Sequence, residues 1–192
     1  DPASLIAGQK AAQASRDAEL AWEQAGPDNF GGSTRAVIYD NSGNILIGTA
    51  GGDIYKTTND GITFQYMAHV DAPISCLAIM GDVLYIGTGD GFNAHLVNGL
   101  DMYDYSTSFV GNGVYKLEGN LMTQVAGTGN AKFVNEMTVV GNDIYAATSE
   151  GLMKNWTVVE EGDFRNVKSH NDGEHLAVNN KDVFLAKAGQ GF

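Results

Sequence analysis

This sequence of 192 residues is poor in cysteine, in positive charge and in long apolar runs. Its single cysteine, Cys76, excludes an internal disulfide framework and a cysteine-rich metal site. No apolar run approaches the roughly 20 residues that a membrane-spanning helix needs, so a direct membrane span is not expected. Eleven lysines and arginines face 23 aspartates and glutamates, giving a net charge of −12 that repels phosphate backbones. Nucleic-acid binding is therefore not expected.

Glycine, by contrast, is abundant. The chain has 25 glycines but only 3 prolines, and no low-complexity tract contains the glycines. Regularly spaced glycines are typical of turns between many short strands. Because 43% of the residues are hydrophobic, the chain can also bury a packed core. Within this pattern Cys76 lies in an apolar run, which predicts a buried, structural thiol.

A repeated strand motif organises most of the chain. An apolar strand that ends in a small-residue triplet occurs at 45–49, 84–88 and 144–148, with a weaker copy at 176–179. Each copy follows an alternating strand and an Asn/Asp/Gly turn that favours a tight hairpin, and each precedes a strand that ends in lysine. The repeat predicts four-stranded antiparallel meanders of the size of a propeller blade. We therefore expect an all-β chain with a β-propeller fold; a β-sandwich is the alternative.

The repeat also predicts the domain organisation. The expected propeller covers 21–192, with blades at 35–68, 74–126, 134–160 and 164–187. The fourth unit ends after its third strand, and the segment 21–25 is a candidate closing strand for it. The chain then holds about four blades, either as a small ring or as part of a larger one. Because the sequence begins at Asp1 without methionine, we expect a precursor segment to have been removed.

The first 20 residues predict a helix that docks on another surface. Asp1 is a suitable N-cap, and Pro2 occupies the first helical position. The alanines that share one helical face, and that we expect to contact a partner or the propeller, are Ala3, Ala7, Ala11, Ala14 and Ala18. An isolated helix of this length is marginally stable in water, so docking is implied.

An insertion at 89–112 lengthens the second blade. Long loops on a rigid scaffold commonly carry recognition. The aromatic side chains that we expect to contact a protein partner are Phe92, Tyr103, Tyr105 and Phe109. The insertion also contains the acids Asp90, Asp101 and Asp104. No cofactor is expected, and the alternative for these acids is Ca²⁺ binding through oxygen ligands, although they lack EF-hand spacing.

The segment 57–64 resembles the Asp box, or BNR repeat, of sialidase-like propellers. The family pattern is Ser-x-Asp-x-Gly-x-Thr-Trp, and the matching structural residues are Thr57, Asn59, Gly61, Thr63 and Phe64. Short polar side chains in such a turn bond back to its backbone, and the glycine takes a left-handed conformation. In the family the box is a structural turn away from the ligand face.

The resemblance extends over 22–70. In this range the sequence is similar to exported bacterial propellers, including photosystem-assembly-factor-like and xyloglucanase-like proteins. It implies a location in the periplasm, at the outer-membrane surface or outside the cell. It also implies a non-enzymatic binding or scaffold propeller within an envelope, secretion or surface complex, bound to a protein partner or to a membrane protein complex. A carbohydrate-active propeller, either a glycoside hydrolase or a glycan-binding module, is the alternative.

The candidate chemistry argues against an enzyme without excluding one. A sialidase clamps its substrate with three arginines, whereas of Arg16, Arg35 and Arg165 only the last two open a first strand and can face the propeller axis. A glycosidase needs two facing carboxylates, and nothing in the spacing pairs the candidates, which are Asp40, Asp90 and Glu136. His170 and His175 flank a hairpin turn on opposite arms, so no metal site is expected there.

Overall fold

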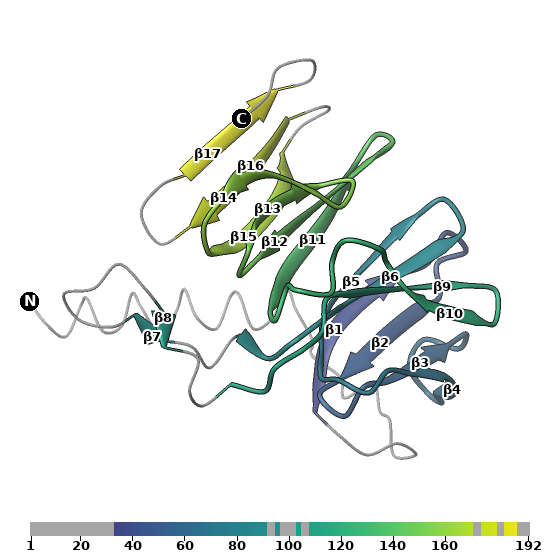
Figure 1. Ribbon diagram of the computed structural model, residues 1–192. Helices are drawn as coiled ribbons and strands as arrows, with labels where there is room; N and C mark the ends of the chain where they lie inside the picture. The colour runs from purple at the N-terminus through teal and green to yellow at the C-terminus, as the bar shows by residue number, and fades with distance from the viewer. Residues whose placement is uncertain are drawn as a thin grey trace, which may run out of the picture.

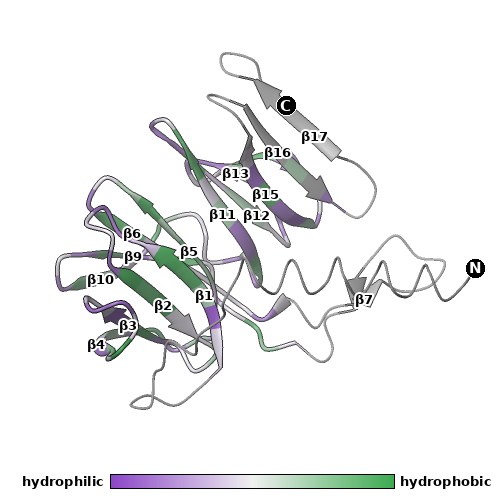
Figure 2. Cartoon of the chain, turned by 180° about the vertical axis from the view of Figure 1, so that it is seen from behind, coloured by the Kyte–Doolittle hydropathy of each residue, from purple (hydrophilic) through white to green (hydrophobic). Residues whose placement is uncertain are grey.

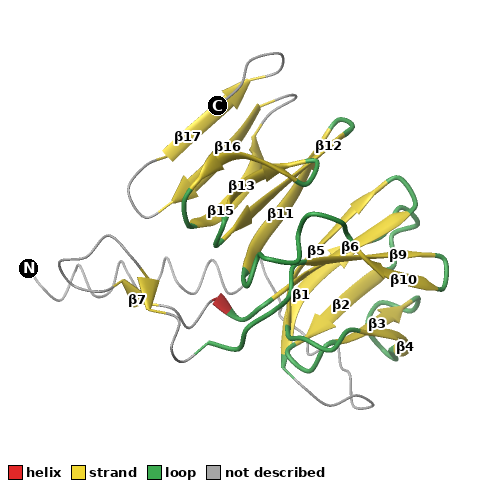
Figure 3. Cartoon of the chain, viewed as in Figure 1, coloured by secondary structure: helices red, strands yellow, loops and turns green. Residues whose placement is uncertain are grey.

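The computed structural model describes residues 33–91, 95–96, 103–104, 108–170, 174–179 and 183–187. These residues form antiparallel β-strands joined by turns and loops (Figures 1 and 3). The described residues contain no α-helix, and no helix among them could cross a membrane. The predicted helix at 1–20 and the predicted closing strand at 21–25 lie outside the described residues.

Three four-stranded sheets and one three-stranded sheet follow one another along the chain, and we call them blades 1 to 4. Blade 1 contains β1 (Thr34–Tyr39), β2 (Ile45–Thr49), β3 (Asp53–Thr57) and β4 (Gln65–His69). Blade 2 contains β5 (Ile74–Met80), β6 (Val83–Thr88), β9 (Val114–Glu118) and β10 (Leu121–Gln124). Blade 3 contains β11 (Val134–Val140), β12 (Asp143–Thr148), β13 (Gly151–Lys154) and β14 (Thr157–Glu161). Blade 4 contains β15 (Phe164–His170), β16 (Glu174–Asn179) and β17 (Val183–Lys187).

The first strands of the blades pack against one another in chain order, β1 against β5, β5 against β11 and β11 against β15. Each first strand pairs antiparallel with the second strand of its own blade, so the start of the first strand lies beside the end of the second. We call this end of the blades the insertion face, because the connection from β6 to β9 leaves from it. The other end, which carries the hairpin turns after each first strand, is the turn face. Within the insertion, β7 (His95–Leu96) pairs with β8 (Tyr103–Asp104).

The hydrophobic core lies between neighbouring blades, because each blade buries one face against the next. Leu46 and Ile54 pack with Leu84 and Leu117 between blades 1 and 2. Tyr85 belongs to the next cluster, between blades 2 and 3, where its ring centroid lies 5.1 Å from that of Trp156. Figure 2 shows the hydrophobic colour along the central strand β2 and along β5.

Both packing and hydrogen bonding explain why small residues end the second strand of the repeat. A Cβ atom on Gly87 would lie 2.8 Å from Cγ1 of Val134 in blade 3, so only glycine fits at this close approach. The threonines that end the triplets at 45–49, 84–88 and 144–148 are buried, and in blades 1 and 3 their hydroxyls bond to the turn that follows. Thr148 Oγ1 donates to the carbonyl of Gly151 at 2.8 Å, and Thr49 Oγ1 accepts from the amide of Asp53 at 3.1 Å.

Cys76 is buried between blades 2 and 3, as the sequence predicts. Burial raises the pKa of its thiol to about 12. A thiol with so high a pKa is not ionised at neutral pH, and only the thiolate is a nucleophile. Cys76 is therefore a small core residue with no reactive chemistry.

Candidate binding face

Each first strand carries a β-bulge at the same place, where it starts on the insertion face. The register of the strand pair shifts across the second residue in all four blades. The bulged residues are all polar: Arg35, Ser75, Asn135 and Arg165. A bulge redirects the side chain of the extra residue out of the regular alternation. The fold therefore places one polar side chain per blade at the insertion face.

Two of these bulged residues join their blade to the next one. The hydroxyl of Ser75 donates to the carbonyl of Val134, the first residue of β11. The amide of Asn135 donates to the carbonyl of Phe164, the first residue of β15, at 2.7 Å. Each buried donor thus satisfies the carbonyl that directly precedes the bulge of the following blade. We call this repeated hydrogen bond the interblade joint.

Arg35 makes an ion pair at the first of these positions. Its Nη2 atom lies 2.8 Å from Oδ2 of Asp90, the second residue of the insertion. The Asp90 side chain is 4% exposed and that of Arg35 is 28% exposed, so the pair is largely shielded from water on the aspartate side. Removing one partner of a pair in such a setting leaves a buried charge without compensation, which is strongly destabilising.

Arg165 reaches the next residue of the same insertion. Its Nη2 atom donates to the carbonyl of Gly91 at 2.6 Å. Gly91 is buried against Asn135, whose amide oxygen a Cβ atom on Gly91 would meet. Arginines of blades 1 and 4 therefore hold two consecutive residues of an insertion that belongs to blade 2. This arrangement clamps the start of the insertion onto the insertion face.

Backbone hydrogen bonds fix both ends of the insertion to the same face. The amide of Asp90 donates to the carbonyl of Phe109 at 2.8 Å, so the two ends lie side by side. The amide of Gly111 donates to the carbonyl of Lys132 at 2.8 Å, which ties the end of the insertion to the segment before blade 3. Thr88 Oγ1 donates to the carbonyl of Gly113 at 2.6 Å and closes the base. The insertion therefore projects from a rigid stem.

Two apolar side chains are exposed on this stem. Phe109 is 71% exposed and Val110 is 57% exposed. Large apolar side chains held in water by a rigid backbone are typical of contact surfaces. Of the other predicted contact residues, the side chains of Phe92, Tyr103 and Tyr105 lie outside the described residues, as do the five alanines.

An acidic hollow opens on the same face between blades 2 and 3. Its volume is about 470 Å³. The lining includes two exposed glutamates, Glu150 and Glu161, together with Met153 and Val158. The face thus combines exposed apolar groups with negative charge, which favours a partner that carries both apolar and basic side chains.

The turn at 57–64 is closed by its own side chains and lies on the turn face. Thr57 Oγ1 accepts from the amides of Asn59 and Gly61, at 3.3 and 3.1 Å. Asn59 Oδ1 accepts from the amide of Thr63 at 3.0 Å, and Gly61 has a φ of 87°. The turn therefore has the self-bonded form and the left-handed glycine that its sequence implies. Its residues take part in local structure, far from the insertion stem.

Two of the candidate carboxylates, Asp40 and Asp90, lie at opposite ends of the blades. Asp40 lies at the turn face, where Lys56 Nζ is 2.7 Å from its Oδ2 atom, and this contact holds its pKa well below the usual range. Five residues of extended strand, roughly 17 Å, separate it from Arg35 and hence from Asp90. Glu136 pairs instead with Lys168 at 2.9 Å. Asp40 and Asp90 cannot flank one glycosidic bond.

No metal site forms among the described residues. They contain no cluster of three or more histidine, cysteine or acidic side chains that could hold an ion. The predicted Ca²⁺ ligands Asp101 and Asp104 have side chains outside the described part, while Asp90 is engaged by Arg35. His170 and His175 lie on paired strands, β15 and β16, with Ser169 opposite His175.

Sequence reasoning selected Arg35 and Arg165 but missed Ser75 and Asn135. The signal was present, because a polar residue stands second in every first strand just before the apolar alternation. The bulge that makes these positions equivalent is a register shift of one residue, and no local sequence pattern distinguishes it from ordinary alternation. The contact of both arginines with the same insertion also depends on tertiary structure alone.

Comparison with known proteins shows the fold and nothing narrower. No family model matches this chain, and no curated protein matches it. Among solved structures, the computationally designed Ika4 protein matches over 88% of this chain and all of its own, with 10% identity and a TM-score of 0.55. The WD40 β-propeller domain of Doa1 matches over 82% of this chain and 52% of its own, with 14% identity and a TM-score of 0.51.

The extracellular domain of a hybrid two-component system from B. thetaiotaomicron matches over 79% of this chain, with 12% identity and a TM-score of 0.55. The chain spans 21% of that extracellular domain and about half of the Doa1 propeller domain. Together with the four successive antiparallel sheets, these matches show a β-propeller fold.

Proposed function

We propose that this chain is a non-enzymatic binding or scaffold propeller that holds a protein partner on its insertion face. The observation that carries the proposal is the clamped stem with its exposed tip. Asp90 and Gly91 are held by arginines of two other blades, yet Phe109 beside them is 71% exposed. Rigid support of an exposed aromatic lowers the entropy lost on binding and suits a protein contact.

The wider setting is part of the same proposal. The resemblance of residues 22–70 to exported propellers supports a place in an envelope, secretion or surface complex, and one matched structure is itself an extracellular domain. In this setting the alanine face of the segment 1–20 and the aromatics of the insertion contact the complex. The acidic hollow on the insertion face supports a partner with basic side chains.

Recovery of partners from native envelope fractions tests the proposal. We expect Phe109→Ser to reduce recovery of the captured protein about tenfold, because it removes a large anchor side chain. Ile62→Ser is the matched control, since Ile62 is 72% exposed but lies in the turn at 57–64 on the turn face. Equal recovery by both variants would remove the insertion face from the proposal.

Two further measurements separate the parts of the proposal. Deletion of residues 1–20 tests the docking segment, and unchanged recovery would confine the contact to the propeller. A panel of fluorogenic glycosides tests the carbohydrate-active alternative. Hydrolysis that is lost in Asp90→Asn would overturn the non-enzymatic assignment, because Asp90 is a candidate carboxylate on the insertion face.

A further inference from the structure

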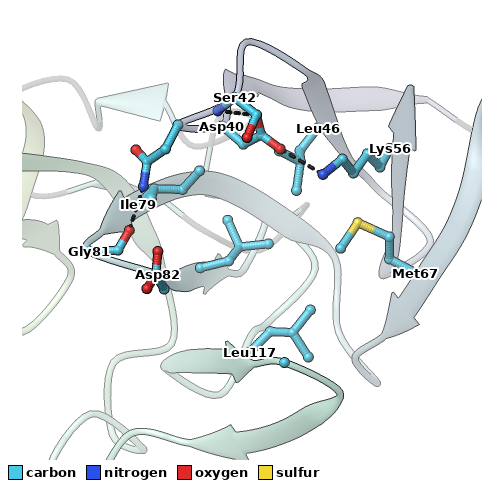
Figure 4. A pocket seen from close by; sticks show the side chains of 12 residues that line it. Asp40, Ser42, Leu46, Lys56, Met67, Ile79, Gly81, Asp82 and Leu117 are labelled. Atoms are coloured by element: carbon cyan, nitrogen blue, oxygen red, sulfur yellow. Dashed lines mark hydrogen bonds and ion pairs between the residues drawn. The ribbon is translucent and has the colours of Figure 1, made fainter. Parts of the chain in front are cut away.

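A pocket on the turn face, between blades 1 and 2, is independent of the insertion face. Its volume is about 270 Å³. Its apolar lining comes from both blades: Leu46, Met67, Ile79, Leu84 and Leu117. Figure 4 shows Leu46, Met67 and Leu117 directed into the space from different strands, with polar groups at its edge. We call this space the interblade pocket.

The interblade pocket exists because two aromatic side chains that fill the next interface have no counterpart here. Leu46 lies three residues before Thr49, and Tyr85 lies three residues before Thr88, so the two are equivalent in the repeat. Tyr85 packs on Trp156 and fills the equivalent position in the interface between blades 2 and 3. Leu46 is shorter than tyrosine, and the turn of blade 2 that corresponds to Trp156 contains Gly119.

Hydrogen bonds hold the rim of the interblade pocket in place. Asn41 Nδ2 donates to the carbonyl of Gly81 at 2.8 Å and links the hairpin turns of the two blades. Asp40 accepts from the amides of Ser42 and Asn44, both at 2.9 Å, and pairs with Lys56 (Figure 4). The pocket is thus a formed feature of the fold and does not depend on a loose loop.

The charge at the rim selects the kind of group that fits. Asp82 is exposed at the edge of the pocket, and no ion pair joins it to another side chain in the described part of the chain. The other rim carboxylate, Asp40, is already neutralised by Lys56. A cation that lies above the pocket therefore meets Asp82, and the net charge of −12 attracts basic segments to the molecule as a whole.

The volume and the lining of the interblade pocket favour an aromatic ring as the apolar group of the ligand. A cavity of about 150 Å³ lined by apolar side chains holds benzene, so a volume of about 270 Å³ is large enough for a phenyl side chain. Met67, which is 39% exposed, brings a flexible thioether to the rim, where a sulfur–aromatic contact is favourable.

We propose that the interblade pocket binds a peptide segment of a partner protein in which an aromatic side chain is followed by a lysine or arginine. The aromatic ring enters between Leu46 and Leu117, and the cation pairs with Asp82. This site lies beyond the contact proposed for the insertion face and on the opposite end of the blades. The chain then carries two binding surfaces, as a scaffold requires.

Nuclear magnetic resonance with short synthetic peptides tests the proposal on the full chain. The probe is the hexapeptide Gly-Gly-Phe-Lys-Gly-Gly, titrated against the ¹⁵N-labelled protein. We expect saturable amide shifts at 40–46, 81–84 and 117–119. Replacing the phenylalanine of the probe by glycine weakens binding about tenfold or more, because the anchor is lost. In the original probe, replacing the lysine by glutamate also weakens binding, because the glutamate then faces Asp82 and the like charges repel.

Two protein variants locate the site. Asp82→Asn removes the charge and gives this turn the sequence that blade 3 already has at the same place, Gly141-Asn142. The two turns have the same backbone conformation at their glycines, since Gly81 and Gly141 both have a φ of 61°. We expect a loss of affinity of about two- to fivefold, as for an exposed ion pair. Glu160→Gln is the matched control, because Glu160 is exposed and lies on β14, away from the pocket.

Leu46→Tyr fills the pocket by reproducing the residue that blade 2 has at this position. We expect binding of the hexapeptide to fall at least tenfold while the thermal unfolding midpoint stays within a few degrees. If this variant does not fold, Asp82→Lys replaces it, since a surface charge reversal in a turn leaves the core intact. The proposal is wrong if the hexapeptide produces no shifts at millimolar concentration, or if the shifts persist unchanged in Leu46→Tyr. Either result leaves the Phe109 experiment on the insertion face unaffected.

Discussion

Arg35 of blade 1 and Asp90 of the insertion in blade 2 form an ion pair across a blade interface, with 2.8 Å between Nη2 and Oδ2. The pair joins the inner start of one blade to the base of a segment that projects from its neighbour. Because Asp90 is nearly inaccessible to water, its charge requires a partner in the folded state. The ion pair therefore couples the packing of blades 1 and 2 to the position of the insertion.

Arg35→Gln should lower the free energy of unfolding by about 2–4 kcal/mol, since it leaves the Asp90 carboxylate buried without the guanidinium. The measurement is urea denaturation. Arg35→Gln with Asp90→Asn completes a double-mutant cycle, and we expect the double variant to be more stable than Arg35→Gln alone. Hydrogen exchange at the amide of Asp90 should accelerate in the single variant. Additive effects in the cycle would contradict the coupling.

Asn135→Ala should cost about 1–3 kcal/mol in unfolding free energy, because it leaves the buried carbonyl of Phe164 without its donor. The loss should appear as faster hydrogen exchange in β15 before exchange in β1, since the interblade joint at Asn135 connects blades 3 and 4. Asn142→Ala is the control, because Asn142 is exposed in a hairpin turn. An equal loss in both variants would show that the interblade joint contributes nothing specific.

Asp40 should make the protein sensitive to acid. The Lys56 ammonium and the Asn44 amide hold the pKa of Asp40 well below its ordinary value. The stability that this group contributes is therefore present above about pH 4 and is lost as the pH falls towards the lower pKa of the folded state. Thermal unfolding should show Asp40→Asn less stable than the wild type at pH 6, with the difference shrinking below about pH 4. Lys56→Met should show the same trend, and a difference that does not change with pH would refute it.

His69 should make a smaller contribution to stability, with a pH dependence opposite to that of Asp40. The Asp53 carboxylate lies 2.8 Å from its Nδ1 atom and raises the pKa of the imidazole, with Asp71 acting in the same direction. A raised pKa means that the contribution is complete below the unfolded value near 6.5 and disappears as the pH rises through the higher folded value. His69→Gln should therefore be less stable relative to the wild type at pH 5.5 than at pH 8.5. A nuclear magnetic resonance titration of His69 with and without Asp53→Asn measures the pKa directly, and an unchanged value would rule out Asp53 as the cause.

The strands could be predicted because each residue pattern that marks them has a local cause. The terminal threonine of a triplet bonds to the turn that follows, and a glycine such as Gly81, with a φ of 61°, takes the left-handed conformation of its hairpin turn. The buried environment of Cys76 followed from its apolar neighbours for the same reason.

The candidate binding face was predictable only in part. Arg35 and Arg165 were selected because each opens a strand, yet their shared partner, the segment Asp90–Gly91, depends on how three blades meet. The interblade pocket was missed altogether. It results from a short side chain, Leu46, at a position where the next blade has tyrosine, and the meaning of that difference appears only when the two interfaces are compared.

The interblade joint has a direction, since Ser75 donates from blade 2 to blade 3 and Asn135 donates from blade 3 to blade 4. At these two junctions the earlier blade supplies the side-chain donor and the later blade supplies the backbone carbonyl, so each hydrogen bond involves only the two blades that it joins. Duplication of blade 3 would therefore repeat the same kind of hydrogen bond at the new junction, because the acceptor is a backbone carbonyl. At these two junctions the architecture can therefore gain a blade without a compensating substitution in the joint.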